Sequence, residues 1–230
     1  MIKKLLLTLA PVLALAVFAV MPAFAQAETK AYGTCEATTK ALQEHPPCPE
    51  NERHFKAFAN KKAEKVISKL DPGETFVLTT AAGVSIECTS FSDKGTVTNE
   101  AGVGHSEEEL VFDHCTFTNG PLAGCSVKST GAPNSNEIIG KVTNVVLTEV
   151  TVEIKVTAPG IKLETDGNPA GCPVGAQLGT VTGTAVGKQE KGSDILIFTK
   201  ATGLKLGEEA ATITGSDILE TAAGKPIVIN

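Results

Sequence analysis

The sequence predicts an all-β protein, an antiparallel sandwich or barrel with a short N-terminal helix and a disulfide-tied segment before it. After residue 74, short segments rich in Val, Ile and Thr recur between glycine-containing turns. Residues 150–156 alternate between Val or Ile and polar residues, which is typical of a strand with one buried face. Turn signals recur about every 8–12 residues without a helical pattern between them, which favours antiparallel strands over a parallel βαβ sheet.

The first 25 residues predict a secretory signal peptide. Lys3 and Lys4 precede an apolar run over residues 5–21, and small residues, Ala23 and Ala25, occupy the positions that signal peptidase recognises. An uncleaved anchor is the alternative, because the run is near the lower length limit for a membrane span. We expect cleavage after Ala25 and a secreted chain, extracellular or in the cell envelope, that does not span the membrane.

Charge and length limit the function classes. Loss of the signal peptide leaves 18 basic and 26 acidic residues, a net charge of −8. An acidic chain repels phosphate backbones, so we expect no nucleic-acid partner. The remaining length suits one domain with a small N-terminal extension. The predicted division is a signal peptide over 1–25, a polar and helical segment over 26–73, and a β domain over 74–230.

The segment before the β domain has two parts. Residues 26–51 are polar and rich in proline, which excludes a helix there. In residues 52–69, apolar side chains fall on a helical stripe with Asn51 as a candidate N-cap, which predicts a helix. The competing interpretation is a strand over 64–70 that turns at Asp71–Glu74 into a second strand over 75–80.

The predicted strands of the β domain follow in order. They cover residues 75–80, 84–91, 95–98, 108–117, 126–129, 137–156, 160–165, 176–186, 194–200, 211–214 and 225–229.

Six cysteines predict a disulfide framework, because an even count is typical of exported chains. They are Cys35, Cys48, Cys88, Cys115, Cys125 and Cys172. Proximity along the chain favours Cys35–Cys48 and Cys115–Cys125, which leaves Cys88–Cys172. Buried free thiols are the alternative. Zinc is disfavoured because neither CxxC nor HxxxH occurs.

The polar residues 104–109 and 113–115 contain the strongest candidate chemistry. Two imidazoles, His105 and His114, and several carboxylates are residue types that bind divalent metals. On one strand, however, the two histidines are too far apart to share an ion. We therefore interpret residues 104–109 as a solvated acidic turn that leads into an edge strand. No metal ligand, catalytic residue or cofactor is assigned.

An enzymatic site has weak support in the sequence. No GxSxG motif occurs, so a hydrolytic triad around His105 or His114 would need a hydroxyl and a carboxylate supplied by the fold. The chain has no Trp and one Tyr. This argues against a sugar-stacking surface and against the aromatic girdles of outer-membrane barrels.

Several short motifs resemble a group of uncharacterised secreted β-rich proteins of high-GC Gram-positive (actinobacterial) soil bacteria. The matching segments are 83–90 (GVSIECTS), 95–98 (GTVT), 110–115 (LVFDHC), 124–131 (GCSVKSTG) and 136–140 (NEIIG), then Cys172 before 181–183. The match covers about residues 75–190. The chain departs from the group in its Cys35/Cys48 segment and in Asn136 before Glu137, where the group has glycine. The resemblance implies an exported β domain with a four-cysteine core and supplies no catalytic residue.

These observations together predict an exported, non-enzymatic protein of the cell envelope or extracellular space, with a binding or structural role. An envelope or extracellular protein is the expected type of partner. An exported hydrolase with a site around His105 or His114 is the alternative.

Overall fold

Alternating apolar and polar residues form long antiparallel strands in the computed structural model of the chain. The structure describes residues 31–36, 54–100, 103–134, 136–147, 151–163, 172, 176–189 and 192–229. The strands are β1 (Tyr32–Glu36), β2 (His54–Ala57), β3 (Glu64–Leu70), β4 (Phe76–Thr80), β5 (Ser85–Glu100), β6 (Val103–Phe117), β7 (Val127–Ser129), β8 (Ile138–Leu147), β9 (Thr151–Leu163), β10 (Gln177–Gln189), β11 (Ile195–Leu206), β12 (Glu209–Thr221) and β13 (Ile227–Ile229), with a short 3-10 helix, η2 (Gly120–Leu122).

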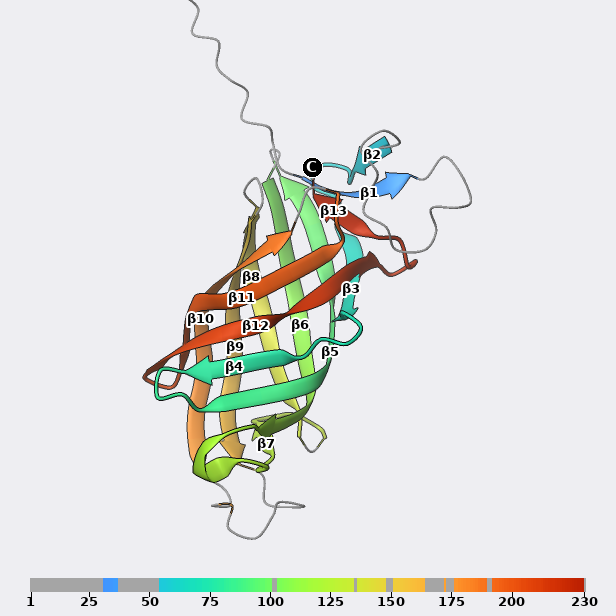
Figure 1. The fold of residues 1–230 in the computed structure, drawn as a ribbon. Coiled ribbons are helices and arrows are strands. Elements are labelled where there is room, and N and C mark those ends of the chain that lie inside the picture. The colour runs from blue at the N-terminus through green and yellow to red at the C-terminus, as the bar shows by residue number, and fades with distance from the viewer. Residues whose placement is uncertain are drawn as a thin grey trace, which may run out of the picture.

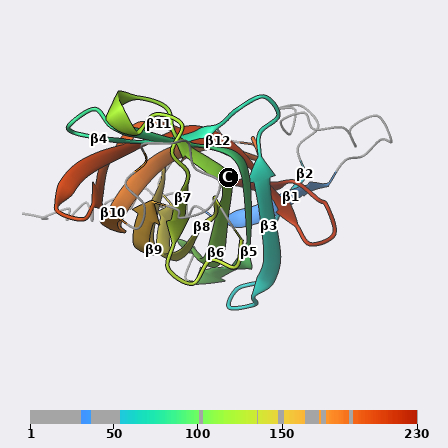
Figure 2. The same cartoon turned by 90° about the horizontal axis from the view of Figure 1, so that it is seen from below.

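The main sheet closes on itself as an eight-stranded antiparallel barrel. Neighbours follow the order β10-β11-β12-β3-β5-β6-β8-β9, and β9 pairs with β10 to complete the ring (Figures 1 and 2). Strands that follow each other along the chain are therefore neighbours, and the pairing of β12 with β3 joins the two ends of this meander. The predicted all-β antiparallel class is confirmed, and the architecture is the barrel.

The strands β3 and β4 share one position in the barrel wall. Residues 66–70 of β3 pair with residues 217–221 of β12, and β4 continues along residues 211–214 of the same strand. Between them, the N–H of Asp71 donates to the carbonyl of Ser216 (3.1 Å), and the N–H of Glu74 donates to Asp71 (3.0 Å). The turn at residues 71–74 thus separates two short strands, β3 and β4, which lie one after the other beside β12.

A second, three-stranded sheet covers one end of the barrel. It has the order β13-β1-β2 and lies at the upper end in Figure 1, opposite β7. We call these three strands the cap. Tyr32, Ile227 and Ile229 of the cap are buried and belong to the same core cluster as Val66 and Val97 of the barrel. The cap therefore closes the barrel through apolar contacts.

Side chains fill the interior of the barrel in two clusters. The cluster nearer the cap contains a group of phenylalanines, in which the ring of Phe76 lies 4.8 Å from Phe91, 5.3 Å from Phe112 and 6.2 Å from Phe198 between centroids. The other cluster contains Ile86, Ile161 and the cysteines of two disulfides. An eight-stranded barrel has an interior that side chains can fill, as they do here.

The predicted helix over residues 52–69 is wrong. Residues 54–57 and 64–70 are strands, so the competing interpretation of a strand over 64–70 and a turn at 71–74 is confirmed. The side chains of β3 alternate between the two faces: Val66 is buried, whereas Ile67 is 39 % exposed. Residues that the sequence analysis placed in the N-terminal segment thus form part of the barrel wall.

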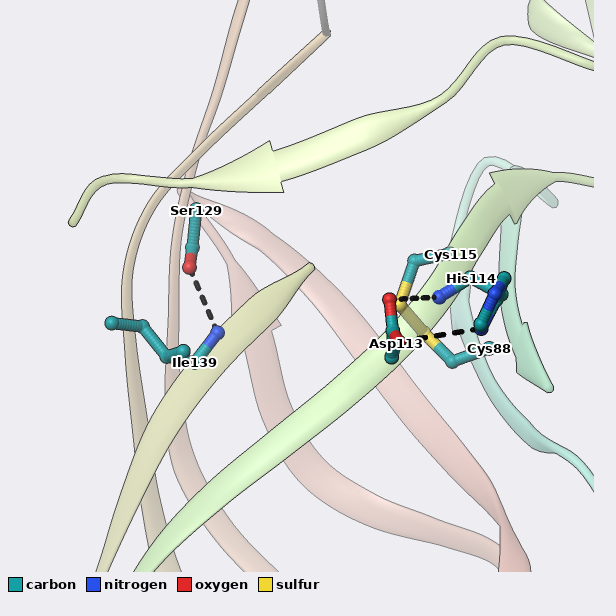
Figure 3. Close-up of a disulfide and its surroundings, with 6 residues drawn as sticks. All are labelled: Cys88, Asp113, His114, Cys115, Ser129 and Ile139. Atoms are coloured by element: carbon teal, nitrogen blue, oxygen red, sulfur yellow. Dashed lines mark hydrogen bonds and ion pairs between the residues drawn. A yellow bond between two sulfur atoms is a disulfide. The ribbon is translucent and has the colours of Figure 1, made fainter. Parts of the chain in front are cut away.

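Two disulfides are present among the described residues, and their pairing differs from the one predicted by proximity. Cys88 bonds to Cys115 across the neighbouring strands β5 and β6, and Cys125 bonds to Cys172 (Figure 3). The predicted pairs Cys115–Cys125 and Cys88–Cys172 are therefore wrong. The strand register places Cys88 directly opposite Cys115, and this outweighs the shorter separation along the chain. The predicted Cys35–Cys48 pair lies outside the described residues, as does the predicted signal peptide.

No helix among the described residues is long and apolar enough to cross a membrane. Two disulfides suit a chain that folds in an oxidising compartment.

Candidate functional site

The two histidines singled out in the sequence are far apart on the barrel. Both lie on β6, and nine residues of extended strand correspond to about 30 Å. Residues 104–109 belong to this strand, which lies between β5 and β8. The predicted acidic turn leading into an edge strand is therefore wrong, and the fold does not bring His105 and His114 into one site.

His114 has one acidic neighbour. Its side chain is exposed. The backbone N–H of His114 donates to Asp113 Oδ1 (2.7 Å), and the imidazole Nδ1 lies 3.4 Å from Asp113 Oδ2 (Figure 3). The neighbouring Cys115 is bonded to Cys88 and fully buried. In the same view the N–H of Ile139 donates to Ser129 Oγ (2.8 Å), which joins the β7 and β8 segments. This region is built as a strand junction.

His105 lines an open hollow on the outer surface of β5 and β6. Thr96, Thr98, Glu100 and Glu107 line the same hollow, which has a volume of about 360 Å³. Hydroxyl and carboxylate groups are thus present around one imidazole. No hydrogen bond joins His105 to a hydroxyl or carboxylate among the described residues, so a catalytic triad is not assembled there.

A cluster of three buried carboxyl groups, which the sequence analysis missed, lies inside the barrel. Asp93 on β5 and Asp217 on β12 are 7 % and 4 % exposed, and Glu108 on β6 faces them. Asp93 is directly opposite Ser68 of β3, and Glu108 is opposite Gly95 of β5. A Cβ atom on Gly95 would lie 2.7 Å from the Cα and Cγ of Glu108. The glycine therefore gives the Glu108 side chain its space.

Burial raises the pKa of each of these carboxyl groups. For Glu108 the nearby Asp93 carboxyl adds to the effect of burial, and the pKa is well above its usual range. The pKa of Asp93 is also raised by burial, although hydrogen bonding with Glu108 and Ser68 offsets part of this. Burial and then the charge of Asp93 raise the pKa of Asp217 well above its usual range. Glu108 and Asp93 thus form an acid pair whose pKa values are both raised, because each is buried next to the other.

The three carboxyl groups line a space of about 50 Å³ inside the barrel, together with Phe76, Phe91 and Phe198 among other apolar residues. We call this space the acid cavity. A second space of about 50 Å³ in the other half of the barrel is lined by Cys88, Ile86, Ile161 and further apolar side chains. Sites for drug-sized ligands are roughly 300–1,000 Å³, so neither space holds one. Within the described part of the chain, no three His, Cys, Asp or Glu residues are arranged to hold a metal ion.

Tyr32 of the cap is buried in the same core cluster as Phe76 and Phe91, which line the acid cavity. Its side chain is 2 % exposed, and burial, followed by the charges of Glu108, Asp217 and Asp93, raises its pKa well above the usual range. The position of its backbone is set by Asn99: the N–H of Tyr32 donates to Asn99 Oδ1 (3.0 Å), and Asn99 Nδ2 donates to the Tyr32 carbonyl (2.9 Å). The cap and the three acids are therefore in electrostatic contact.

The alternation of residues could have revealed these acids. Asp93 lies two residues from Phe91 and four from Val97, both buried, and Glu108 lies two residues before the buried Leu110. In a strand, such spacing places side chains on one face. The surrounding polar residues suggested solvated turns instead. No family model, curated protein or solved structure matches the chain.

Proposed function

We propose that the chain is an exported, non-enzymatic protein of the cell envelope or extracellular space, in which the barrel is a rigid scaffold and its outer surface binds a protein partner. The N-terminal signal pattern and the resemblance to secreted actinobacterial proteins support export. The two disulfides suit that location.

The filled interior is the observation that carries the proposal. Two spaces inside the barrel are each about 50 Å³, so neither has room for a metabolite-sized substrate or ligand among the described residues. Recognition by this fold would then use the outside of the wall, where the strands present polar side chains at fixed positions.

One part of the outer wall has the features of a binding surface. The hollow that contains His105 continues into a second hollow of about 350 Å³ over β3, β5 and β6, and the two share Thr96 and Glu107. The second hollow is lined by Lys65, Lys94 and Ile67, and Ile67 is one of the few large apolar side chains exposed on the described surface. We call the two hollows together the outer groove. An apolar residue between charged groups is typical of a protein-binding surface.

Site-specific cross-linking tests this proposal. A photoreactive amino acid at Thr96, inside the outer groove, should capture a defined protein from the envelope or medium of the producing cells. The same group at Thr199, an exposed residue of β11, is the matched control and should capture nothing at that mass. Reversing the charges with K65E and K94E should remove the adduct. Equal labelling from both positions would contradict the proposal.

An exported hydrolase is the second candidate, because hydroxyls, carboxylates and the imidazole of His105 line one hollow. Screening the purified chain against ester, peptide and glycoside substrates tests this candidate. Turnover that H105A abolishes and H114A preserves would establish the hydrolase and overturn the non-enzymatic proposal. The non-enzymatic proposal expects no turnover above that of H105A.

A further inference from the structure

The acid cavity has carboxyl and hydroxyl groups on several sides, and no basic side chain lines it among the described residues. Three titratable groups line it, Asp93 from β5, Glu108 from β6 and Asp217 from β12, and the charge of each acts on Tyr32 of the cap. Asp71, in the turn between β3 and β4, adds a further negative charge that acts on Asp217. None of the groups that shift these carboxyls is a Lys, Arg or His. Buried carboxylates without a counter-charge are strongly disfavoured.

Polar atoms around the acid cavity are also left without well-aligned hydrogen bonds. Asp93 Oδ1, Ser68 Oγ and Ser106 Oγ are buried without a well-aligned hydrogen-bond partner, and Ser68 and Ser106 are 5 % and 2 % exposed. The walls are mostly apolar, and the described residues include no metal-binding arrangement. Protons, rather than a metal ion or a basic side chain, are therefore what neutralises the carboxyl groups of the acid cavity.

The cap is the element that feels the charge of the acid cavity. The charges of the three acids act on its Tyr32, and among the described residues outside the β12–β13 turn its backbone is joined to the barrel by isolated hydrogen bonds rather than by a ladder. Asn99 bonds to the Tyr32 backbone, Gln189 Nε2 donates to the Ile227 carbonyl (3.1 Å), and the N–H of Gly192 donates to Ile229 (3.3 Å). The barrel strands, in contrast, pair along ladders such as residues 86–100 of β5 with 103–117 of β6. Local opening starts where such connections are few.

We propose that the acid cavity and the cap form a pH-operated latch: the protonated carboxyls keep the cap seated, and loss of their protons releases it from the mouth of the barrel. In the closed state the acids are shielded from water and hold protons. In the open state water reaches them and they ionise, so each opening releases protons to solvent. Because the closed state binds more protons than the open state, raising the pH shifts the equilibrium toward opening.

Tyr32 is itself the reporter for the test. The chain contains one Tyr and no Trp, so its intrinsic fluorescence reports on the cap alone. The purified full chain is titrated from about pH 4 to about pH 9, and quenching by neutral acrylamide measures the exposure of Tyr32. Hydrogen exchange, corrected for the intrinsic pH dependence, measures opening of β1 and β13 against β9 and β10 in the same samples.

We expect acrylamide quenching of Tyr32, and corrected exchange in β1 and β13, to rise with pH while β9 and β10 stay protected. The rise should be about tenfold for each unit by which the pKa of one carboxyl is higher in the closed than in the open state. E108Q replaces the protonated carboxyl group with an uncharged amide of similar shape, and it should reduce the rise in quenching and exchange with pH. E109Q is the control, because Glu109 is exposed on the outer face of the same strand and does not line the outer groove, and it should behave as wild type.

Constant exposure of Tyr32 in the wild-type chain across this range would overturn the latch. So would an equal rise in the exchange of β9 and β10, because this would mean general unfolding of the barrel. An unchanged pH dependence in E108Q would overturn the role of the acid cavity. The wild-type series decides the question even if the buried variants do not fold.

Discussion

Replacing Cys115 and Cys125 together with alanine separates the disulfide pairing of the structure from the pairing that proximity favours. In the structure these cysteines belong to different bridges, Cys88–Cys115 and Cys125–Cys172, so the double variant loses both. The bridges close loops with separations of 27 and 47 residues, worth about 3.6 and about 4.1 kcal/mol on the chain-entropy model. The two loops do not overlap along the chain, so we expect a loss of roughly 7–8 kcal/mol.

The matched control is C88A/C115A, which removes one bridge and should lose about 3.6 kcal/mol. Denaturant unfolding gives the free energy of each variant, and thiol titration after unfolding counts the free cysteines. C115A/C125A should expose Cys88 and Cys172 as two free thiols and be far less stable than the control. A variant in which Cys88 and Cys172 remain bonded, with a loss of only about 3 kcal/mol, would refute the pairing.

Three further predictions concern the interior of the barrel. The unfolding free energy of the wild-type chain should fall as the pH rises above the pKa of its acids in the unfolded state, by about 1.4 kcal/mol per pH unit for each proton that only the folded state retains. In E108Q this fall should be smaller by the contribution of one proton. Wild-type and E108Q curves of unfolding free energy against pH that run parallel would contradict the prediction. F76A should cost about 3–5 kcal/mol in denaturant unfolding, because its ring packs on three others, and a loss under 1 kcal/mol would contradict the packing. In an absorbance titration the phenolate of Tyr32 should appear only at a pH above that at which acrylamide quenching rises, because the buried phenol must be exposed before it ionises; phenolate absorbance that precedes the rise in quenching would contradict its burial.

The fold class could be predicted because β-strands have a strong local signature. The alternation predicted for residues 150–156 falls within β9 from Thr151 onward, and the turn at 71–74 was recognised from Asp, Pro and Gly. The helix over 52–69 was wrong because a few apolar residues satisfy a helical and an alternating pattern equally well. In β3 the inward Val66 and outward Ile67 follow the strand pattern, which tertiary pairing with β5 and β12 selects.

Long-range features could not be obtained from local patterns. Closure of the barrel depends on pairing between residues 66–70 and 217–221, which no local motif specifies. The Cys88–Cys115 bridge depends on the register of two long strands, and sequence proximity gives no information on that register. The acids were missed for a related reason. Asp93 and Glu108 are surrounded in the sequence by exposed polar residues, and they differ from these only in lying on the inward face of their strands.

Both the surface-binding proposal and the latch depend on closure of the barrel. The pairings of β12 with β3 and of β9 with β10 complete the ring, so they are the most direct target for a test. Cross-strand nuclear Overhauser effects between backbone protons should connect Leu219 with Ser68 and Gly187 with Val152, completing one antiparallel ring. We predict both contacts in the same sample. Absence of either pairing would leave an open sheet, and absence of both would leave two separate sheets; each result would contradict the closed barrel and the inferences that depend on it.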